Sequence, residues 1–373
     1  MQAGRLPRDG GAIEVRYLTA RELSAQAPRL STAATAAVTL LQDWFGPFPA
    51  ESLTVAGTPW RGSDHGTALP GLVTAPLRWI APVRDQSMER AIIGALVRQY
   101  FAPDVAASQP FVDSLITYAA TRAVHHLLEG SNFAAPRFFG GFVPFPLRTV
   151  LLSPPVGDPR PRVAGFAELA VRTDGRDLRG VRALESLERY VGWPTMLAAL
   201  SQLRMRDASE WTALALADAL STLRGTDMRF LVQECVRADA VFDYAIGDLR
   251  SQAVASGQVE TTVTIVRRGT GRFAIRDNGG AAAGTLPVAV RFADGREIRD
   301  VVDGGAESAT LVYTAPAPAV RAVVDPDVIL LLDADRANNA VVRDAKMSKL
   351  GIRLAMHWLA WLQNTMLSYA ALS

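Results

Sequence analysis

Apolar side chains recur with helical spacing in two neighbouring segments between Met88 and Leu128. The first segment carries its apolar face at Ala91, Ile92, Ala95, Leu96 and Gln99, and the second repeats the spacing at Phe111, Leu115, Tyr118, Ala119 and Arg122. A loop with Pro103, Asp104 and Pro110 separates them. The pattern predicts two buried helices that fold back on one another as antiparallel neighbours.

Helical spacing also predicts that most of the rest of the chain, up to about Val254, is helical. After a short strand at Ala12 to Leu18, a helix is expected from Pro28 to Phe45, where Gly46 and Pro47 end it. Further helices are predicted from a pair that ends near Val191 and from the runs Met196 to Leu203, Trp211 to Leu223 and Met228 to Val236. These elements predict a mostly helical domain.

Beyond Ala253 apolar and polar residues alternate with a period of two, which is typical of β-strands. The predicted strands are Glu260 to Val266, Phe273 to Arg276, Leu286 to Phe292, Glu297 to Val302, Ala309 to Tyr313 and Val320 to Val324. Turn signals such as Asn278-Gly279 and Asp294-Gly295 separate them. Short strands with these turns predict a small β-sandwich.

The last segment, from Lys346 to Ser373, predicts an apolar helix. Its run from Leu350 to Leu372 is long enough to span a bilayer, although polar residues such as His357 interrupt it. Arg343, Lys346 and other basic residues precede it, which suits a membrane interface. A membrane span, an interfacial helix and docking onto protein all remain open.

Composition narrows the possible functions. The chain of 373 residues has a net charge of +2, which argues against a nucleic-acid surface, and we expect protein partners instead. Its single cysteine, Cys235, excludes an internal disulfide and a cysteine-based metal site, and we expect a buried, inert thiol. Abundant alanine and arginine suggest a bacterial source, and no signal peptide begins at Met1. We expect a membrane-associated or cell-envelope protein, with a cytoplasmic one left open.

Two motifs in the predicted helix pair resemble the core of a known enzyme family. Gly94 to Ala102 aligns with H-E-x-x-H-x-W-x-G, and Ile116 to Thr121 aligns with N-E-G-F-A-T. The chain thus resembles the aminopeptidase N family of gluzincin zinc metallopeptidases. Other short segments between Arg16 and Asn339 match motifs of this family in the same order. They are Trp44 to Pro49, Leu53 to Val55, His65 to Gly71, Arg179 to Leu184 and Val241 to Tyr244. The family's N-terminal β domain has no counterpart, so we expect a fragment or a replaced domain.

The resemblance implies a site whose chemical groups are missing. Gly94, Arg98 and Thr117 stand at the positions of the three zinc ligands, and Ala95 stands at the position of the general base. Ala68 replaces the glutamate that anchors the substrate amine, and Asp177 lies near the position of the catalytic tyrosine. We therefore expect no zinc cofactor. A guanidinium at position 98 would repel a cation and could pair with Asp113.

The predicted fold is multidomain α+β. It comprises a mostly helical thermolysin-like domain over residues 1–254, an immunoglobulin-like β-sandwich over 255–340 and an apolar helix over 341–373. The aspartates at 325, 327, 333 and 335 are expected to form turns and caps rather than a calcium site.

The predicted function is a non-catalytic, peptidase-like module for protein interaction or assembly. One alternative is a hydrolase with relocated chemistry at His65, Asp64, Asp113 or the pair His125 and His126. Neighbouring residues on a helix point about 100° apart, so that pair cannot chelate one ion as i, i+4 histidines do. The other alternative is a peptide-binding module that keeps the family's groove. Its groove candidates are Leu69, Pro70, Gly71 and Leu72.

Overall fold

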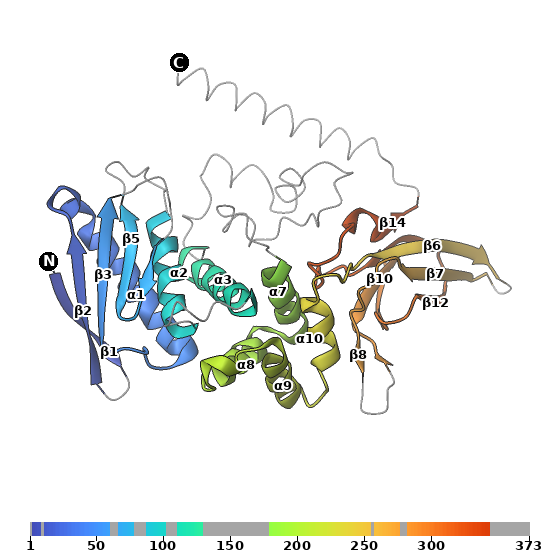
Figure 1. Cartoon of the computed structure of the whole chain (residues 1–373). Coiled ribbons are helices and arrows are strands. Elements are labelled where there is room, and N and C mark those ends of the chain that lie inside the picture. The colour runs from blue at the N-terminus through green and yellow to red at the C-terminus, as the bar shows by residue number, and fades with distance from the viewer. Residues whose placement is uncertain are drawn as a thin grey trace, which may run out of the picture.

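A computed structural model describes residues 2–8, 11–59, 66–77, 87–101, 110–129, 179–254, 257–276 and 282–343. Its described elements lie in a row: an N-terminal sheet with helices against it, a group of helices, and a C-terminal group of strands (Figure 1). A continuous set of buried apolar side chains runs through all three parts. The structure is therefore a mixed α/β fold.

The N-terminal part is a five-stranded sheet with the order β1-β2-β3-β5-β4. Its strands are β1 (Gln2–Arg8), β2 (Gly11–Thr19), β3 (Ser52–Pro59), β4 (Ala68–Leu69) and β5 (Leu72–Leu77). The central pairs β2–β3 and β3–β5 are parallel, and the outer pairs β1–β2 and β4–β5 are antiparallel. Helix α1 (Ala27–Phe45) makes the crossover from β2 to β3 and contacts both strands. Alternating side chains of β2, such as Ile13 and Val15, are fully buried.

Helices α2 (Ser87–Phe101) and α3 (Pro110–Val124) pack together, and α2 also packs against α1 and β5. A π-helical turn, His125–Glu129, extends α3. Aromatic rings join these helices, since the rings of Phe45 and Phe101 have centroids 5.0 Å apart. This packing fixes α2 and α3 between the sheet and the other helices.

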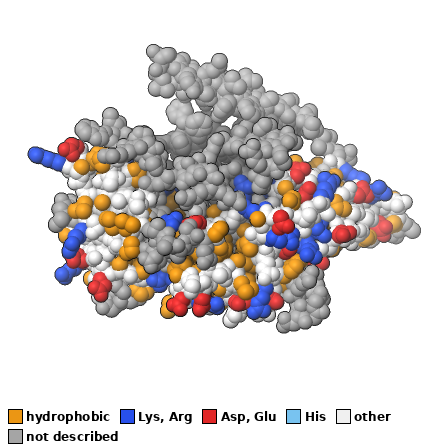
Figure 2. Space-filling model, in the orientation of Figure 1, with side chains coloured by type: hydrophobic (Ala, Val, Ile, Leu, Met, Phe, Trp, Pro, Cys, Tyr) orange, Lys and Arg blue, Asp and Glu red, His pale blue; other side chains and the backbone are white. Residues whose placement is uncertain are grey.

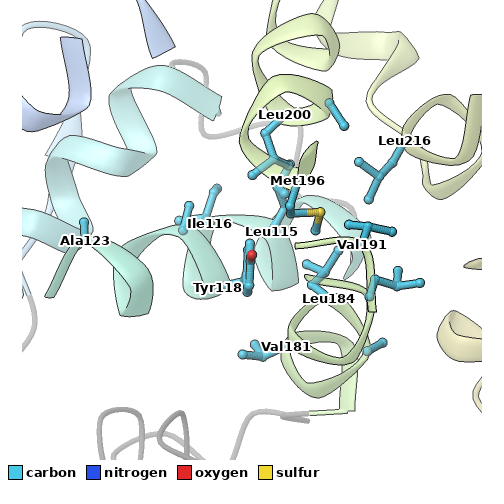
Figure 3. Close-up of a cluster of buried hydrophobic side chains, with 14 of the residues drawn as sticks. Leu115, Ile116, Tyr118, Ala123, Val181, Leu184, Val191, Met196, Leu200 and Leu216 are labelled. Carbon is cyan, nitrogen blue, oxygen red and sulfur yellow. The ribbon is translucent and has the colours of Figure 1, made fainter. Parts of the chain in front are cut away.

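The middle part consists of α7 (Arg179–Val191), α8 (Trp193–Arg204), α9 (Ala213–Arg224) and α10 (Arg229–Val236). Helix α7 contacts α3 on one side and α10 on the other. Side chains from α3, α7, α8 and α9 meet in one buried cluster, in which Tyr118, Leu184 and Met196 lie close together (Figure 3).

The C-terminal part contains two larger sheets and a small one, with the orders β11-β10-β13-β14, β12-β7-β6 and β8-β9. Its strands are β6 (Tyr244–Ala253), β7 (Val259–Arg267), β8 (Ile275–Arg276), β9 (Ala282–Ala283), β10 (Leu286–Phe292), β11 (Glu297–Val302), β12 (Ser308–Ala315), β13 (Ala319–Val324) and β14 (Ala340–Val342). The two larger sheets contact each other through β13 and β6. Charged side chains of both signs are interspersed over this part of the surface (Figure 2).

Most of the helices and strands that were predicted from the periodicity are present, but the predicted fold class is wrong. The described residues form a mixed α/β structure and not a mostly helical, thermolysin-like domain. The prediction failed because helical periodicity is strong in long segments, whereas the five-stranded sheet is built from short strands that pair across α1.

The prediction of helix up to Val254 is also wrong, because Tyr244–Ala253 is strand β6. The register of β6 against β7 shifts between Ile246 and Asp248, at Gly247. This bulge interrupts the alternation of buried and exposed side chains, so the strand lacks a clear period of two.

The predicted apolar run from Leu350 to Leu372 lies outside the described residues. In the part of the chain that the structure describes, no helix has the length and apolar character needed to cross a bilayer.

Candidate functional site

The positions that align with zinc ligands lie around an ion pair between α2 and α3. Arg98 Nη2 is 3.6 Å from Asp113 Oδ1, and both side chains are about one third exposed. This pairing confirms the partner expected for Arg98 from the sequence. Gly94 lies one turn before Arg98, and Thr117 lies one turn after Asp113.

The side chains at these positions do not fit a zinc ion. Gly94 has no side chain, Arg98 carries a positive charge, and Thr117 donates its hydroxyl proton to the carbonyl oxygen of Asp113 at 2.8 Å. Asp113 is the carboxylate at this place, and Arg98 already pairs with it. Across the described residues, no group of three His, Cys, Asp or Glu side chains is arranged to hold a metal ion.

Ala95 and Ala68 contribute no acid or base group. Ala95, which the sequence resemblance aligns with a general base, is buried in the core. Ala68 pairs with Val73 in the β4–β5 hairpin, whose turn contains Pro70 and Gly71. Gly71 has a φ of 68°, which glycine adopts without steric cost.

Gln99 ties this hairpin to α2. Its side chain is buried, accepts a hydrogen bond from Gly71 N at 3.1 Å and donates one to Leu69 O at 2.7 Å. Both ends of the amide are therefore satisfied by main-chain atoms of the turn. Leu69 itself is 45% exposed. Gln99 thus holds the predicted groove residues at a fixed place beside Arg98.

Three residues singled out in the sequence cannot be placed in this site. Asp177, His65 and Asp64 lie outside the described residues.

A pocket of about 120 Å³ lies between α3 and α7, next to this site along α3. Its polar lining comes from Thr121, Arg122 and His125 on one side and from Glu185, Glu188 and Arg189 on the other. Thr121 is one turn beyond Thr117, so the pocket adjoins the residue that the sequence resemblance aligns with a third zinc ligand.

The pocket is built around the buried carboxylate of Glu188. Tyr118 Oη donates to Glu188 Oε2 at 2.6 Å, and Arg122 Nη2 lies 3.0 Å from Glu188 Oε1. The guanidinium of Arg122 also stacks over the ring of Trp193 at 4.6 Å from its centroid. Glu185 pairs with Arg189 at 2.8 Å. Each carboxylate in the pocket is therefore engaged by a donor.

Burial shifts the pKa values of three groups in this pocket. It raises the pKa of Glu188, against the opposing effects of the hydrogen bond from Tyr118 and the charge of Arg122. Burial and the neighbouring carboxylate of Glu188 raise the pKa of Tyr118 well above its ordinary value. Burial, followed by the charge of Arg122, lowers the pKa of His125.

The two adjacent histidines point into different surroundings. His125 lines the pocket, whereas the ring of His126 packs edge-on against Trp44 with centroids 5.6 Å apart.

The pocket does not offer an activated nucleophile. The hydroxyl of Thr121 donates to the carbonyl oxygen of Thr117 at 2.8 Å, and that of Tyr118 donates to Glu188. A raised pKa keeps the phenol protonated. The arrangement is suited to holding charged groups in fixed positions rather than to covalent catalysis.

Sequence reasoning missed Glu188. Its signal was a charged residue at the fourth position after Leu184, inside the apolar stripe that also includes Leu187 and Val191. A carboxylate on a buried helix face requires a partner, and Tyr118 and Arg122 on the facing helix supply it.

Comparisons with known proteins bear on the fold. No protein-family model matches the chain, and no curated protein matches it. Among solved structures, that of Legionella pneumophila aminopeptidase A in complex with aspartic acid is similar, with a TM-score of 0.55 and 11% sequence identity. The fold is thus similar to that of part of this aminopeptidase. The similarity covers 87% of this chain but 36% of that one, so the chain spans little more than a third of the aminopeptidase's length. At this identity the likeness concerns the fold alone.

Proposed function

We propose that this chain is a peptidase-like module without peptidase catalysis, which acts by binding or assembling with other proteins. We further propose that it is a degenerate relative of the aminopeptidase N-like gluzincins. The observation that carries both proposals is the Arg98–Asp113 ion pair at the place of the aligned zinc ligands.

The chemistry of a zinc peptidase explains why this observation supports the proposal. Such an enzyme uses the metal to polarise the carbonyl and activate water, and uses a carboxylate to move protons. Here a guanidinium replaces one ligand, and an alanine, Ala95, replaces the base. Loss of ligand, base and amine anchor together removes each step of the reaction and leaves the packing of α2 and α3 intact.

Turnover of aminoacyl amides tests the proposal. We expect no hydrolysis above background, with or without added zinc, and the same background in an Arg98→Ala variant, since neither chain has the required groups. A zinc-dependent activity that chelation abolishes and zinc restores would overturn the proposal.

The edge of the N-terminal sheet supports a second candidate, the binding of short peptides. Among the described residues β4 is an edge strand of the sheet, and its residue Leu69 is 45% exposed. An extended peptide could add to this edge through main-chain hydrogen bonds, with side-chain contacts from Leu69.

A pair of matched substitutions tests this second candidate function, the binding of short peptides. Leu69→Asp is expected to weaken saturable binding of short peptides, whereas Leu214→Asp on α9, where the leucine is 48% exposed, is expected to leave it unchanged. Equal loss in both variants, or no binding by the unsubstituted chain, would rule it out.

The predicted membrane contact through Leu350 to Leu372 and the cell-envelope location rest on the sequence alone. We retain them as part of the proposal because an apolar helix behind basic residues would place the module at a membrane surface.

A further inference from the structure

The edge strands of this protein differ in how far their sequences prevent pairing with another chain. Charges, prolines and bulges protect exposed edges, because the unpaired main-chain groups there otherwise bind other strands. Among the described sheets, the edge strand β1 carries Arg5 and Pro7, and the edge strand β11 carries Arg299. The edge strand β6 has a bulge next to Asp248. The edge strand β12 has no such protection, because Ser308–Ala315 contains no charged residue, proline or glycine.

The free edge of β12 presents main-chain groups of alternate residues. Arg267 N donates to Glu307 O at 2.9 Å, and these two residues continue the register of β12 against β7. Opposed residues of antiparallel strands alternate between pairs that exchange hydrogen bonds and pairs that do not. The N–H and C=O groups that point away from β7 therefore belong to Ser308, Thr310, Val312 and Thr314. In the described part of the chain no strand pairs with this edge (Figure 1).

The side chains of β12 are also incompletely covered. Val312 is 57% exposed on the outer face of the sheet. On the opposite face Ala309, Leu311 and Tyr313 pack against the core, but each is only partly buried. A further strand beside β12 would cover this apolar row, because opposed side chains of neighbouring strands lie about 4.5–5.5 Å apart.

We propose that β12 pairs in antiparallel fashion with β12 of a second copy of this chain, so that the two three-stranded sheets join across a two-fold axis at Leu311. In this register Leu311 lies opposite the partner's Leu311, and Ala309 lies opposite the partner's Tyr313. The inner face of the joint therefore sets leucine against leucine and a small side chain against a large one. The strand is complementary to itself, as a two-fold interface requires.

The same register satisfies the free main-chain groups. Thr310 lies opposite the partner's Val312, and Ser308 lies opposite the partner's Thr314, so all the residues that point outward exchange hydrogen bonds. No charged residue of β12 faces another across the joint. The second copy is a partner for the assembly role proposed above, but the inference rests on β12 alone. A monomeric chain would overturn it without affecting the proposed absence of peptidase turnover.

Sedimentation equilibrium of the full chain over a wide range of concentrations tests this proposal. We expect a monomer–dimer equilibrium that Val312→Lys weakens at least about tenfold, because the substitution puts a charge on the exposed edge. Val342→Lys is the matched control, since Val342 is 52% exposed on another edge strand, β14. A chain that is monomeric at every concentration would overturn the proposal. So would a dimer that Val312→Lys weakens no more than Val342→Lys does.

Disulfide cross-linking tests the register. Across the joint Leu311 is in a pair without hydrogen bonds, whose Cα atoms are about 4.5 Å apart and within reach of a disulfide. We expect Leu311→Cys to form a covalent dimer on mild oxidation, since the native thiol of Cys235 is buried. Val312→Cys is the control, because it is more exposed but would lie more than ~8 Å from its counterpart. Cross-linking of Leu311→Cys that is absent, or no faster than that of Val312→Cys, would overturn the proposed pairing.

Discussion

At the scale of single residues, burial determines which groups can react. The thiol of Cys235 is fully buried on α10, and burial raises its pKa far above the ordinary value. The thiolate is the reactive form, so we expect no labelling of the native protein by a thiol reagent and labelling of one thiol per chain in denaturant. Rapid stoichiometric labelling of the native chain would show that the thiol is accessible.

The bond between Tyr118 and Glu188 is the second residue-scale feature that can be measured. Tyr118→Phe removes one donor from a buried carboxylate, and we expect it to lower the free energy of unfolding by about 1–3 kcal/mol. Tyr313→Phe is a matched control, because Tyr313 donates to Asp300 at 3.3 Å on the exposed surface. Chemical denaturation of both variants provides the comparison, and equal effects would show that the buried bond has no special role.

At the scale of elements, Gln99 joins the β4–β5 hairpin to α2. Gln99→Ala leaves Gly71 N and Leu69 O without their partner, so we expect a loss of about 1–3 kcal/mol in unfolding free energy and faster hydrogen exchange at Gly71. Gln202→Ala, on the exposed face of α8, is the control. Unchanged exchange at Gly71 in Gln99→Ala would mean that other contacts hold the turn.

Which elements could be predicted depends on whether their signal is local. The helices around Arg98 and Asp113 follow from local periodicity, and so does their ion pair once the two helices are neighbours. The parallel pairing of β2 with β3 does not, because α1 separates the strands and no residue in either specifies its partner. Glu188 was missed for a similar reason, since its partners lie on another helix.

At the scale of the whole molecule, Asp333 makes stability depend on pH. It lies where the residues before β6 meet those before β14, accepts hydrogen bonds from Asn339 Nδ2 and Asp335 N, and is 1% exposed. Burial, with the charge of Asp243 adding to it, raises the pKa of Asp333 to about 6 from its ordinary value of 3.8. The folded state therefore binds a proton that the unfolded state has released across this interval.

The sign of the effect follows from this difference. The contribution of Asp333 to stability is fully present below the unfolded pKa and is lost as the pH rises through about 6. We expect the unfolding free energy of the unsubstituted chain to fall relative to that of Asp333→Asn between pH 4 and pH 7, by on the order of 1–3 kcal/mol. Denaturation curves at several pH values measure it, and parallel pH profiles would contradict the assignment.

The central proposal for the whole molecule is that the chain binds no zinc at Gly94, Arg98 and Thr117, the positions that align with the ligands of zinc peptidases. The most direct measurement is the zinc content per chain, by elemental analysis, after equilibration with zinc and removal of unbound metal. A variant that restores the aligned ligands, Gly94→His, Arg98→His and Thr117→Glu, serves as the positive control, since a side chain at position 94 meets no atom within 4 Å of its Cβ. We predict far less than one zinc per unsubstituted chain and close to one in the variant. The account would be contradicted if the unsubstituted chain bound one zinc tightly and lost a hydrolytic activity when that zinc was removed.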